Sequence, residues 1–166
     1  MKKKLNIAIL TVSDTRNPKT DKSGEILKSK ILNSHHNLFE KKICKDKKIE
    51  IKNILNAWLK KKNLNVIIAT GGTGLTKRDI TPEVFKSFFE KDIPGFGETF
   101  RMLSYKKIKT ATIQSRACAG ISNGKYLFSL PGSPSACKDA WDKIIKYQLD
   151  SSFKPCNLVE ILPKLK

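Results

Sequence analysis

Histidine and cysteine are scarce in this sequence, and neither occurs in a pattern typical of catalysis or metal binding. The four cysteines lack CxxC spacing, which argues against a zinc site and a thioredoxin-type motif; they are Cys44, Cys118, Cys137 and Cys156. The only histidines, His35 and His36, lie in the polar stretch 33–37, which predicts a solvated loop. We therefore expect any catalysis to depend on carboxylates, hydroxyls, Lys, Arg and backbone groups.

Long hydrophobic runs are also absent. No stretch of about 18 apolar residues occurs, so the sequence predicts no membrane span. Lys2–Lys4 resembles the charged start of a signal peptide, but the apolar stretch behind it is interrupted by Asn6 and lacks a small-residue cleavage site. The length of 166 residues, 39% of them hydrophobic, predicts one domain over residues 1–166 with a buried core. We expect the protein to be cytoplasmic.

Acidic residues are outnumbered, with 33 Lys and Arg against 15 Asp and Glu and a formal net charge of +18. Such a charge is compatible with nucleic-acid binding. However, 29 of the basic residues are Lys, spread along the whole chain, and aromatic residues do not alternate with them as a base-stacking surface requires. We therefore expect weak, salt-sensitive attraction to polyanions and no specific nucleic-acid partner.

Arginine occurs only four times, always beside a small-polar or glycine-rich segment, as Arg16, Arg78, Arg101 and Arg116. In a chain that uses Lys for ordinary solvation, Arg is expected where a planar fork must bind a phosphate, a carboxylate or a buried partner. Arg78 is the strongest candidate for anion binding. Structural ion pairing is the alternative for all four.

Apolar patterning predicts strands that alternate with helices. Strands are predicted at 5–12, 38–44, 65–70, 110–114 and 126–130. Helices are predicted at 23–32 and 49–59, from a cap at Thr81, after a loop at 94–97, and from a cap at Ser133. This order is typical of an α/β fold with a mostly parallel sheet and helices on both faces.

The unusual segments follow the predicted strands, where ligands bind in such sheets. In chain order they are Ser13 and Asp14, then Gly71, Gly72, Thr73 and Gly74, and finally Pro131, Gly132 and Ser133. Glycine lets backbone N–H groups approach an anion closely, and helix N-termini favour negative charge. The glycine segment 71–74 matches neither the P-loop nor the GxGxxG pattern. Its position between a strand and a capped helix nevertheless predicts a phosphate-binding loop.

Two carboxylates follow strands that we expect to be neighbours. Asp46 follows the second predicted strand and Asp79 the third, so both side chains could project over the same edge of the sheet. One or two carboxylates beside phosphate oxygens are what hydrated Mg²⁺ prefers. The sequence therefore predicts a Mg²⁺ site formed by Asp46 and Asp79. The alternative is that one of them is a helix cap, Asp79 near Thr81 or Asp46 before the helix at 49–59.

Five segments together resemble the MoaB/Mog family of molybdenum cofactor biosynthesis proteins, and the resemblance covers almost the whole chain. They are Leu10–Asp14, Thr70–Glu83, Gly95–Glu98, Ser115–Ala117 and Leu130–Ser133. Phe100–Ser104 and Gln148–Asp150 are similar to the MoaB branch of that family. The resemblance implies a three-layer α/β/α sandwich of the molybdopterin-binding, MogA-like type. It also implies a homotrimer or homohexamer and further proteins of the same pathway as partners.

The resemblance also implies an activity, because Mog-type domains adenylylate molybdopterin with Mg-ATP before molybdate insertion. Their two essential aspartates match Asp46 and Asp79, and their phosphate contacts match 71–74 and 131–133, while Ser115 lies in another matching segment. We therefore expect a molybdopterin adenylyltransferase with Mg²⁺ as cofactor and ATP as co-substrate. A non-catalytic molybdopterin-binding or carrier protein of the same pathway is the alternative.

Overall fold

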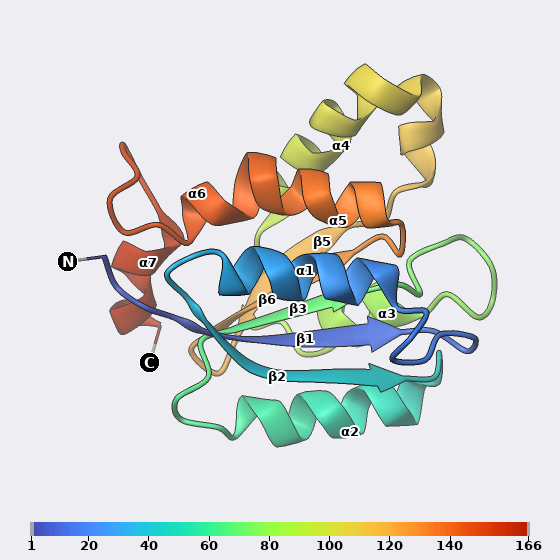
Figure 1. Ribbon diagram of the computed structural model, residues 1–166, viewed down its shortest axis with the longest axis horizontal. Coiled ribbons are helices and arrows are strands. Elements are labelled where there is room, and N and C mark those ends of the chain that lie inside the picture. The colour runs from blue at the N-terminus through green and yellow to red at the C-terminus, as the bar shows by residue number, and fades with distance from the viewer. Residues whose placement is uncertain (1, 166) are drawn as a thin grey trace.

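The computed structural model describes residues 2–165 and shows a central sheet between helices (Figure 1). The strands are β1 (Asn6–Val12), β2 (Asn37–Cys44), β3 (Val66–Thr70), β4 (Lys91–Asp92), β5 (Cys118–Ser122) and β6 (Lys125–Leu130). The longer helices are α1 (Lys22–Leu32), α2 (Lys48–Leu59), α3 (Thr81–Lys86), α4 (Pro94–Ile108) and α5 (Pro134–Ala140). Short helical segments complete the chain: η1 (Lys109–Gln114), η2 (Trp141–Ile145), α6 (Lys146–Gln148), α7 (Leu158–Ile161) and η3 (Leu162–Lys164).

The strands form one six-stranded sheet in the order β2-β1-β3-β6-β5-β4. β1 pairs in parallel with β2 and β3, and β3 pairs in parallel with β6. The pairs of β5 with β6 and of β4 with β5 are antiparallel. The prediction of a mostly parallel sheet is therefore confirmed, with an antiparallel edge.

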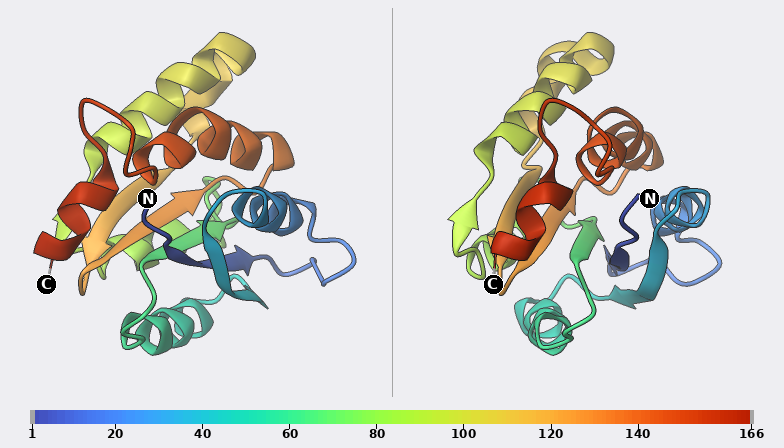
Figure 2. Two further views of the ribbon diagram at one scale, coloured as in Figure 1. Left: turned by 60° about the vertical axis from the view of Figure 1, so that its left-hand side comes forward. Right: turned by 90° about the vertical axis from the view of Figure 1, so that its left-hand side faces the viewer.

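Alternate residues of the central strands point to opposite faces of the sheet and build two separate cores. From β1, Ile7 and Ile9 enter one core, while Ala8 and Leu10 enter the other. The first core includes residues of α1, α4 and α5, and the second includes residues of α2 and α3. Figure 2 shows α2 across the sheet from α4 and α5. The fold is thus the predicted three-layer α/β/α sandwich.

The connections after β1 and β3 leave these neighbouring strands in opposite directions. After β1 the chain enters α1, on the side of the first core, and after β3 it enters α3, on the side of the second. In an open α/β sheet, this reversal opens a crevice beyond the carboxyl ends of the two strands. The loops that begin at Ser13 and Gly71 border that crevice.

The predicted strand at 110–114 is wrong. Lys109 adopts a positive φ of 52° at the end of α4, and the following residues form the 3-10 helix η1. Ile113 is 84% exposed, so this segment has no core against which a strand could pack. The strand is instead β5, joined to β6 by Asn123 and Gly124, which have φ values of 46° and 70°. Two successive positive φ values are typical of a tight hairpin turn.

The starts of three helices, α3, α4 and α5, were predicted with different success. Residues 94–97 are not a loop but the first turn of α4, which Pro94 opens at a position where its missing N–H costs nothing. Thr81 does not cap α3, because the N-cap residue is Ile80, which makes no side-chain cap bond. The Ser133 cap is confirmed, since its hydroxyl accepts a hydrogen bond from the Ala136 N–H in α5.

The histidine stretch forms a turn, but His36 is not solvated. It is only 6% exposed, and its Nδ1 accepts a hydrogen bond from the Leu5 N–H at 3.3 Å. Burial, followed by the nearby His35, lowers the pKa of His36 to about 4. His36 is therefore a structural residue that joins the turn before β2 to the start of β1.

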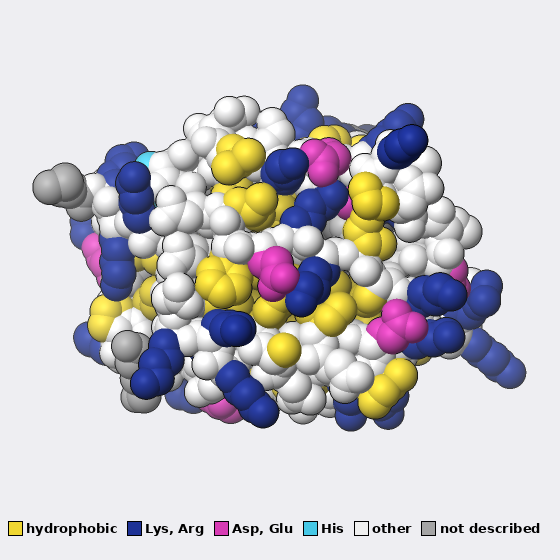
Figure 3. All heavy atoms as spheres, turned by 60° about the horizontal axis from the view of Figure 1, so that its bottom comes forward, with side chains coloured by type: hydrophobic (Ala, Val, Ile, Leu, Met, Phe, Trp, Pro, Cys, Tyr) yellow, Lys and Arg dark blue, Asp and Glu magenta, His cyan; other side chains and the backbone are white. Residues whose placement is uncertain are grey.

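On the face drawn in Figure 3, basic side chains are scattered, with acidic and hydrophobic side chains between them. This distribution follows from the spread of lysine along the chain. Weak, salt-sensitive attraction to polyanions stays a prediction. Within residues 2–165, every helix is too short or too polar to cross a membrane.

Candidate functional site

A cavity of about 460 Å³ lies at the carboxyl ends of β1 and β3. It is lined by the loop after β1, the glycine segment after β3, one residue after β2 and one after β6. The predicted site residues that it brings together are Ser13, Asp14, Asp46, Gly71, Gly72, Thr73, Gly74, Arg78, Asp79 and Gly132. Four loops that are far apart in the sequence therefore share one cavity.

Two glycines allow the loop after β3 to turn tightly at this cavity. Gly71 has a φ of +101°, and a Cβ there would lie 2.1 Å from the Val12 carbonyl oxygen. Gly72 has a φ of +61°, and a Cβ there would lie 2.2 Å from Thr81 Oγ1. A residue with a side chain would strain the backbone and displace its neighbours at either position. The loop therefore packs closely against β1 and α3.

Asp46 and Asp79 face the same cavity, although the reason expected from the sequence is wrong. β1 lies between β2 and β3, so the strands that precede the two aspartates are not neighbours. A Cβ on Gly72 would lie 2.8 Å from Asp46 Oδ2, and a Cβ on Gly74 would lie 2.7 Å from Asp79 Oδ2. The glycine segment itself brings the two carboxylates to one site.

Neither carboxylate caps a helix, so that alternative is wrong. α2 begins after Lys47 and α3 after Ile80, and neither N-cap makes a side-chain bond. Asp79 Oδ2 instead accepts hydrogen bonds from the Thr76 N–H at 3.0 Å and the Thr76 hydroxyl at 2.6 Å. The hydroxyl bond is the main cause that lowers the pKa of Asp79. Asp79 thus stays ionised in a loop that closes on itself.

Asp46 is the more buried carboxylate of the pair. Burial is the main cause that raises its pKa, with a further increase from the charges of Asp79 and Asp14 and partial compensation by a backbone bond from Ile80. Its Oδ1 is buried and has no hydrogen-bond partner in the described part of the chain. A divalent cation would supply the missing positive charge and a ligand for that oxygen. The carboxylates therefore fit Mg²⁺.

The carboxylates alone would not complete a metal shell. Among residues 2–165, no three His, Cys, Asp or Glu side chains are arranged to hold a metal ion. Mg²⁺ usually binds through one or two carboxylates, with substrate phosphates and water as its other ligands. The site thus fits a cation that arrives with a phosphate-bearing substrate.

The four arginines have different roles. Arg16, Arg101 and Arg116 each donate hydrogen bonds to backbone carbonyls of other segments. The side chain of Arg78 is 80% exposed and lies 3.5 Å from the Asp14 carboxylate. Arg16 and Arg78 both line the cavity, but Arg16 is held by Ser23 and the Gly132 carbonyl. Arg78 is therefore the one of these two that is more open to an anion. The sequence thus singled out Arg78, the arginine most open to an anion, but it did not reveal which backbone carbonyls the other three bind.

Three predicted residues do not line the cavity. Ser115 follows η1, and its buried hydroxyl has no hydrogen-bond partner within the described residues. The Pro131 carbonyl accepts a hydrogen bond from the Thr70 hydroxyl at 2.9 Å, which ties the end of β6 to the end of β3. Ser133 caps α5 directly after Gly132. Their roles in ligand binding stay predictions.

Residues 8–151 match the family described as a probable molybdopterin binding domain. The chain belongs to this molybdopterin-binding domain family. Molybdenum cofactor biosynthesis protein B of Escherichia coli strain K12 is 43% identical over 158 residues, which cover 95% of this chain and 93% of the relative. The protein of the same name from Staphylococcus aureus strain COL is 42% identical over 151 residues, with 86% of each chain covered.

Solved structures of proteins named for cofactor or molybdopterin biosynthesis resemble this molybdopterin-binding domain. A crystal structure of molybdenum cofactor biosynthesis protein B has a TM-score of 0.88 and 37% identity, and 98% of this chain and 96% of that chain are covered. The tungsten cofactor synthesizing protein MoaB from Pyrococcus furiosus has a TM-score of 0.82 and 35% identity, with 98% of both chains covered. The Mog protein from Mycobacterium ulcerans, at 22% identity and a TM-score of 0.81, shares the fold. The predicted membership of the MoaB/Mog family is confirmed.

Proposed function

We propose that this molybdopterin-binding domain acts in molybdenum cofactor biosynthesis by transferring the adenylyl group of ATP to molybdopterin. The pathway is supported by the family and by relatives named for it. The transfer step is supported above all by the cavity in which Asp46 and Asp79 meet the glycine segment 71–74. Carboxylates that hold a cation and backbone groups that bind phosphates are what nucleotidyl transfer needs.

In the proposed reaction, an oxygen of the terminal phosphate of molybdopterin attacks the α-phosphorus of ATP. A new P–O bond forms there, the bond from the α-phosphorus to the β-phosphate oxygen breaks, and pyrophosphate leaves. A phosphate monoester is largely ionised at neutral pH, so the nucleophile needs no strong base. This agrees with a cavity whose lining residues include no histidine.

Each part of the cavity has a role in this proposal. The backbone N–H groups of Gly72–Gly74 bind phosphate oxygens, and Arg78 neutralises charge on the transferred group. Asp46 and Asp79 would hold Mg²⁺, which when bound neutralises the triphosphate. Asp14 accepts a hydrogen bond from the Asp46 N–H at 3.2 Å and so orients the segment that carries Asp46.

The test is to mix the protein, molybdopterin and Mg-ATP and to measure adenylylated pterin and pyrophosphate. We expect the two products in equal amounts, and neither product when a chelator removes Mg²⁺. Titration of the protein with ATP, with and without Mg²⁺, distinguishes this activity from that of a non-catalytic carrier. A protein that binds molybdopterin but neither binds nor consumes ATP would be a non-catalytic carrier.

We also propose that the chain forms a homotrimer or homohexamer through α4 and η1. The C-terminal half of α4 and η1 project beyond the sheet (Figure 1). Their apolar side chains that are more than half exposed are Met102, Tyr105, Ile108 and Ile113. Exposed apolar side chains gathered on one surface indicate an interaction site. Because each subunit carries a charge of +18, apolar contact must overcome electrostatic repulsion. A monomer in sedimentation at micromolar concentration would contradict this assembly.

A further inference from the structure

The segment 73–79 carries Asp79 but has no regular secondary structure. The Asp79 N–H donates to the Thr76 carbonyl at 3.1 Å, and Thr76 binds the Asp79 carboxylate in return, so the segment closes on itself. Leu75 at its tip is 67% exposed and adds little packing. The ends of the segment must therefore hold it against the rest of the domain.

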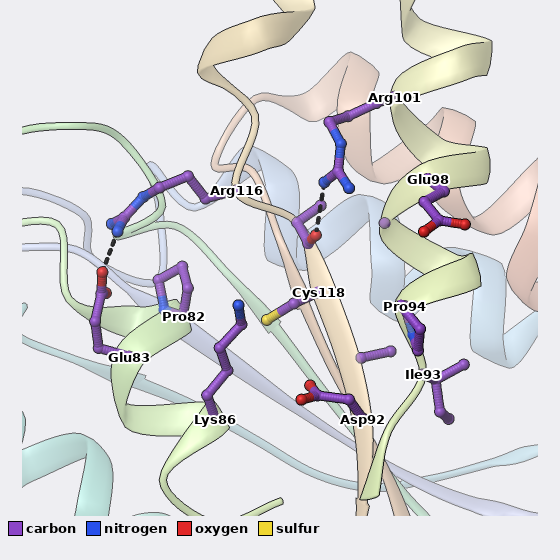
Figure 4. Close-up of a pocket in the computed structure, with 13 residues that line it drawn as sticks. Pro82, Glu83, Lys86, Asp92, Ile93, Pro94, Glu98, Arg101, Arg116 and Cys118 are labelled. Atoms are coloured by element: carbon purple, nitrogen blue, oxygen red, sulfur yellow. Dashed lines mark hydrogen bonds and ion pairs between the residues drawn. The ribbon is translucent and has the colours of Figure 1, made fainter.

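One side chain, that of Arg116, binds both ends. Its Nε donates to the Thr73 carbonyl at 3.3 Å, and its Nη2 donates to the Asp79 carbonyl at 2.6 Å. Its Nη1 binds the Glu83 carboxylate on α3 (Figure 4). Within residues 2–165, no other side chain from outside the segment donates a hydrogen bond to its backbone.

The chemistry of arginine suits this arrangement. A guanidinium is planar and holds five N–H donors in a fixed geometry, so one side chain can bind acceptors that lie apart. A lysine ammonium carries its donors on a single atom and cannot span the same acceptors. Only Ala117 separates Arg116 from the start of β5. The contacts of Arg116 therefore connect the segment to the sheet. This accounts for an arginine at position 116 in a chain rich in lysine.

We propose that Arg116 is a positioning residue that holds Asp79 in the geometry needed for Mg²⁺ and phosphate binding. The inference rests on the proposed function, since Asp79 is the group being positioned. Arg116 does not line the cavity that contains Asp79; it borders a second cavity of about 630 Å³, together with Lys86 and Cys118 (Figure 4). The charge of Arg116, which is paired with Glu83, contributes to lowering the pKa of Asp79. A lysine at position 116 would keep that charge and lose only the geometry of the contacts.

The variant Arg116→Lys keeps the positive charge and tests this role in two ways. The amides of Thr76 and Asp79 should exchange with deuterium about tenfold faster than in the wild type, because the segment opens more often once its ends are released. The kcat of adenylyl transfer should fall by roughly tenfold to a hundredfold while the KM for ATP changes less than about threefold. A displaced Asp79 would weaken the transition state more than it weakens nucleotide binding.

Two control variants leave the contacts with the segment in place. Arg101→Lys changes an arginine on the opposite wall of the second cavity, which donates to the Ala117 carbonyl at 3.2 Å (Figure 4). Glu83→Gln removes the charge beside Arg116 but retains an oxygen that accepts its hydrogen bond. In both variants, the amide exchange rates of Thr76 and Asp79 and the kcat of adenylyl transfer should stay within about twofold of the wild type, as expected for substitutions outside the site.

The proposal would be overturned if the amides of Thr76 and Asp79 exchanged with deuterium as slowly in Arg116→Lys as in the wild type. It would also be overturned if Arg101→Lys accelerated their exchange as much as Arg116→Lys does. The exchange measurement also separates this inference from the proposed function. If the wild type transfers no adenylyl group, the proposed function fails, whereas faster exchange in Arg116→Lys still supports the positioning role. If the wild type is active and the exchange is unchanged, only the positioning role fails.

Discussion

Replacing Asp79 by Asn tests the proposed site most directly, because it removes one negative charge and little else. Asp79 Oδ2 accepts two hydrogen bonds from Thr76, at 3.0 and 2.6 Å. The amide oxygen of Asn can accept both bonds, so the closed segment should persist. The variant therefore separates the charge of Asp79 from its structural contacts.

The two effects of Asp79→Asn should differ in size. A hydrogen bond to a charged group contributes about 1.5–3 kcal/mol and one to a neutral group about 1 kcal/mol. Because Asp79 is half-buried and solvent screens its charge, we expect a loss of only about 1 kcal/mol of stability. For a chain of this length, that lowers Tm by roughly 2–4 °C. The loss of a carboxylate that would hold Mg²⁺ against the reacting phosphate should reduce transfer by about a hundredfold or more.

The difference in stability should also depend on pH. The pKa of Asp79 is lowered, mainly by the hydrogen bond from the Thr76 hydroxyl. A carboxylate with a lowered pKa stabilises the fold above its unfolded pKa, and this contribution is lost as the pH falls through the folded pKa. The gap in Tm between the wild type and Asp79→Asn should therefore close below about pH 4.

Adenylyl transfer and calorimetric melting, measured on the same preparations, would test these magnitudes. Asp139→Asn is the matched control, since this carboxylate lies on α5, away from the cavity. Burial raises its pKa, but hydrogen bonds from Lys107 and Lys143 outweigh burial and lower the pKa overall. This variant should melt at a slightly lower temperature and transfer at the wild-type rate. If Asp79→Asn retained full activity and lost only stability, Asp79 would be a structural residue and the proposed catalytic site would be refuted.

Three further substitutions test separate parts of the molecule. Gly72→Ala should lower both Tm and the rate of adenylyl transfer. A φ of +61° costs a residue with a side chain about 1–2 kcal/mol, and the new Cβ would lie 2.2 Å from Thr81 Oγ1. A Tm equal to that of the wild type would contradict the tight turn. The wild type should lose stability as the pH falls from 6.5 to about 4, because His36 gains a proton when unfolded but not when buried with its pKa of about 4. In His36→Gln this loss should be absent, which melting curves across that pH range would show. Ser133→Ala should cost about 1 kcal/mol in urea unfolding by removing the α5 cap, whereas Ser135→Ala, on the exposed side of the same helix, should cost less.

Much of the fold could be predicted because it depends on residues close together in the sequence. β1 and β3 are nearly continuous apolar runs, as expected for strands covered on both faces. The cap at Ser133 needs only the hydroxyl and the N–H three residues later. The segment 110–114 was mistaken for a strand because its local pattern does not show whether a neighbouring strand exists to pair with it. The Asn123–Gly124 pair was the missed signal for the β5–β6 hairpin.

The candidate site was predictable as a set of residues but not as an arrangement. The need for glycine at 71 and 72, the hydroxyls and the carboxylates could all be read along the chain. Their meeting in one cavity depends on the order β2-β1-β3, which differs from the order expected when Asp46 and Asp79 were placed on neighbouring strands. The contact of Arg116 with the Asp79 carbonyl joins residues 37 positions apart. Such long-range contacts require the ends of long loops to be brought together, and the burial of both cores offsets the entropy that this costs. That balance involves the whole chain, so only the tertiary structure could place Arg116 beside the loop of Asp79.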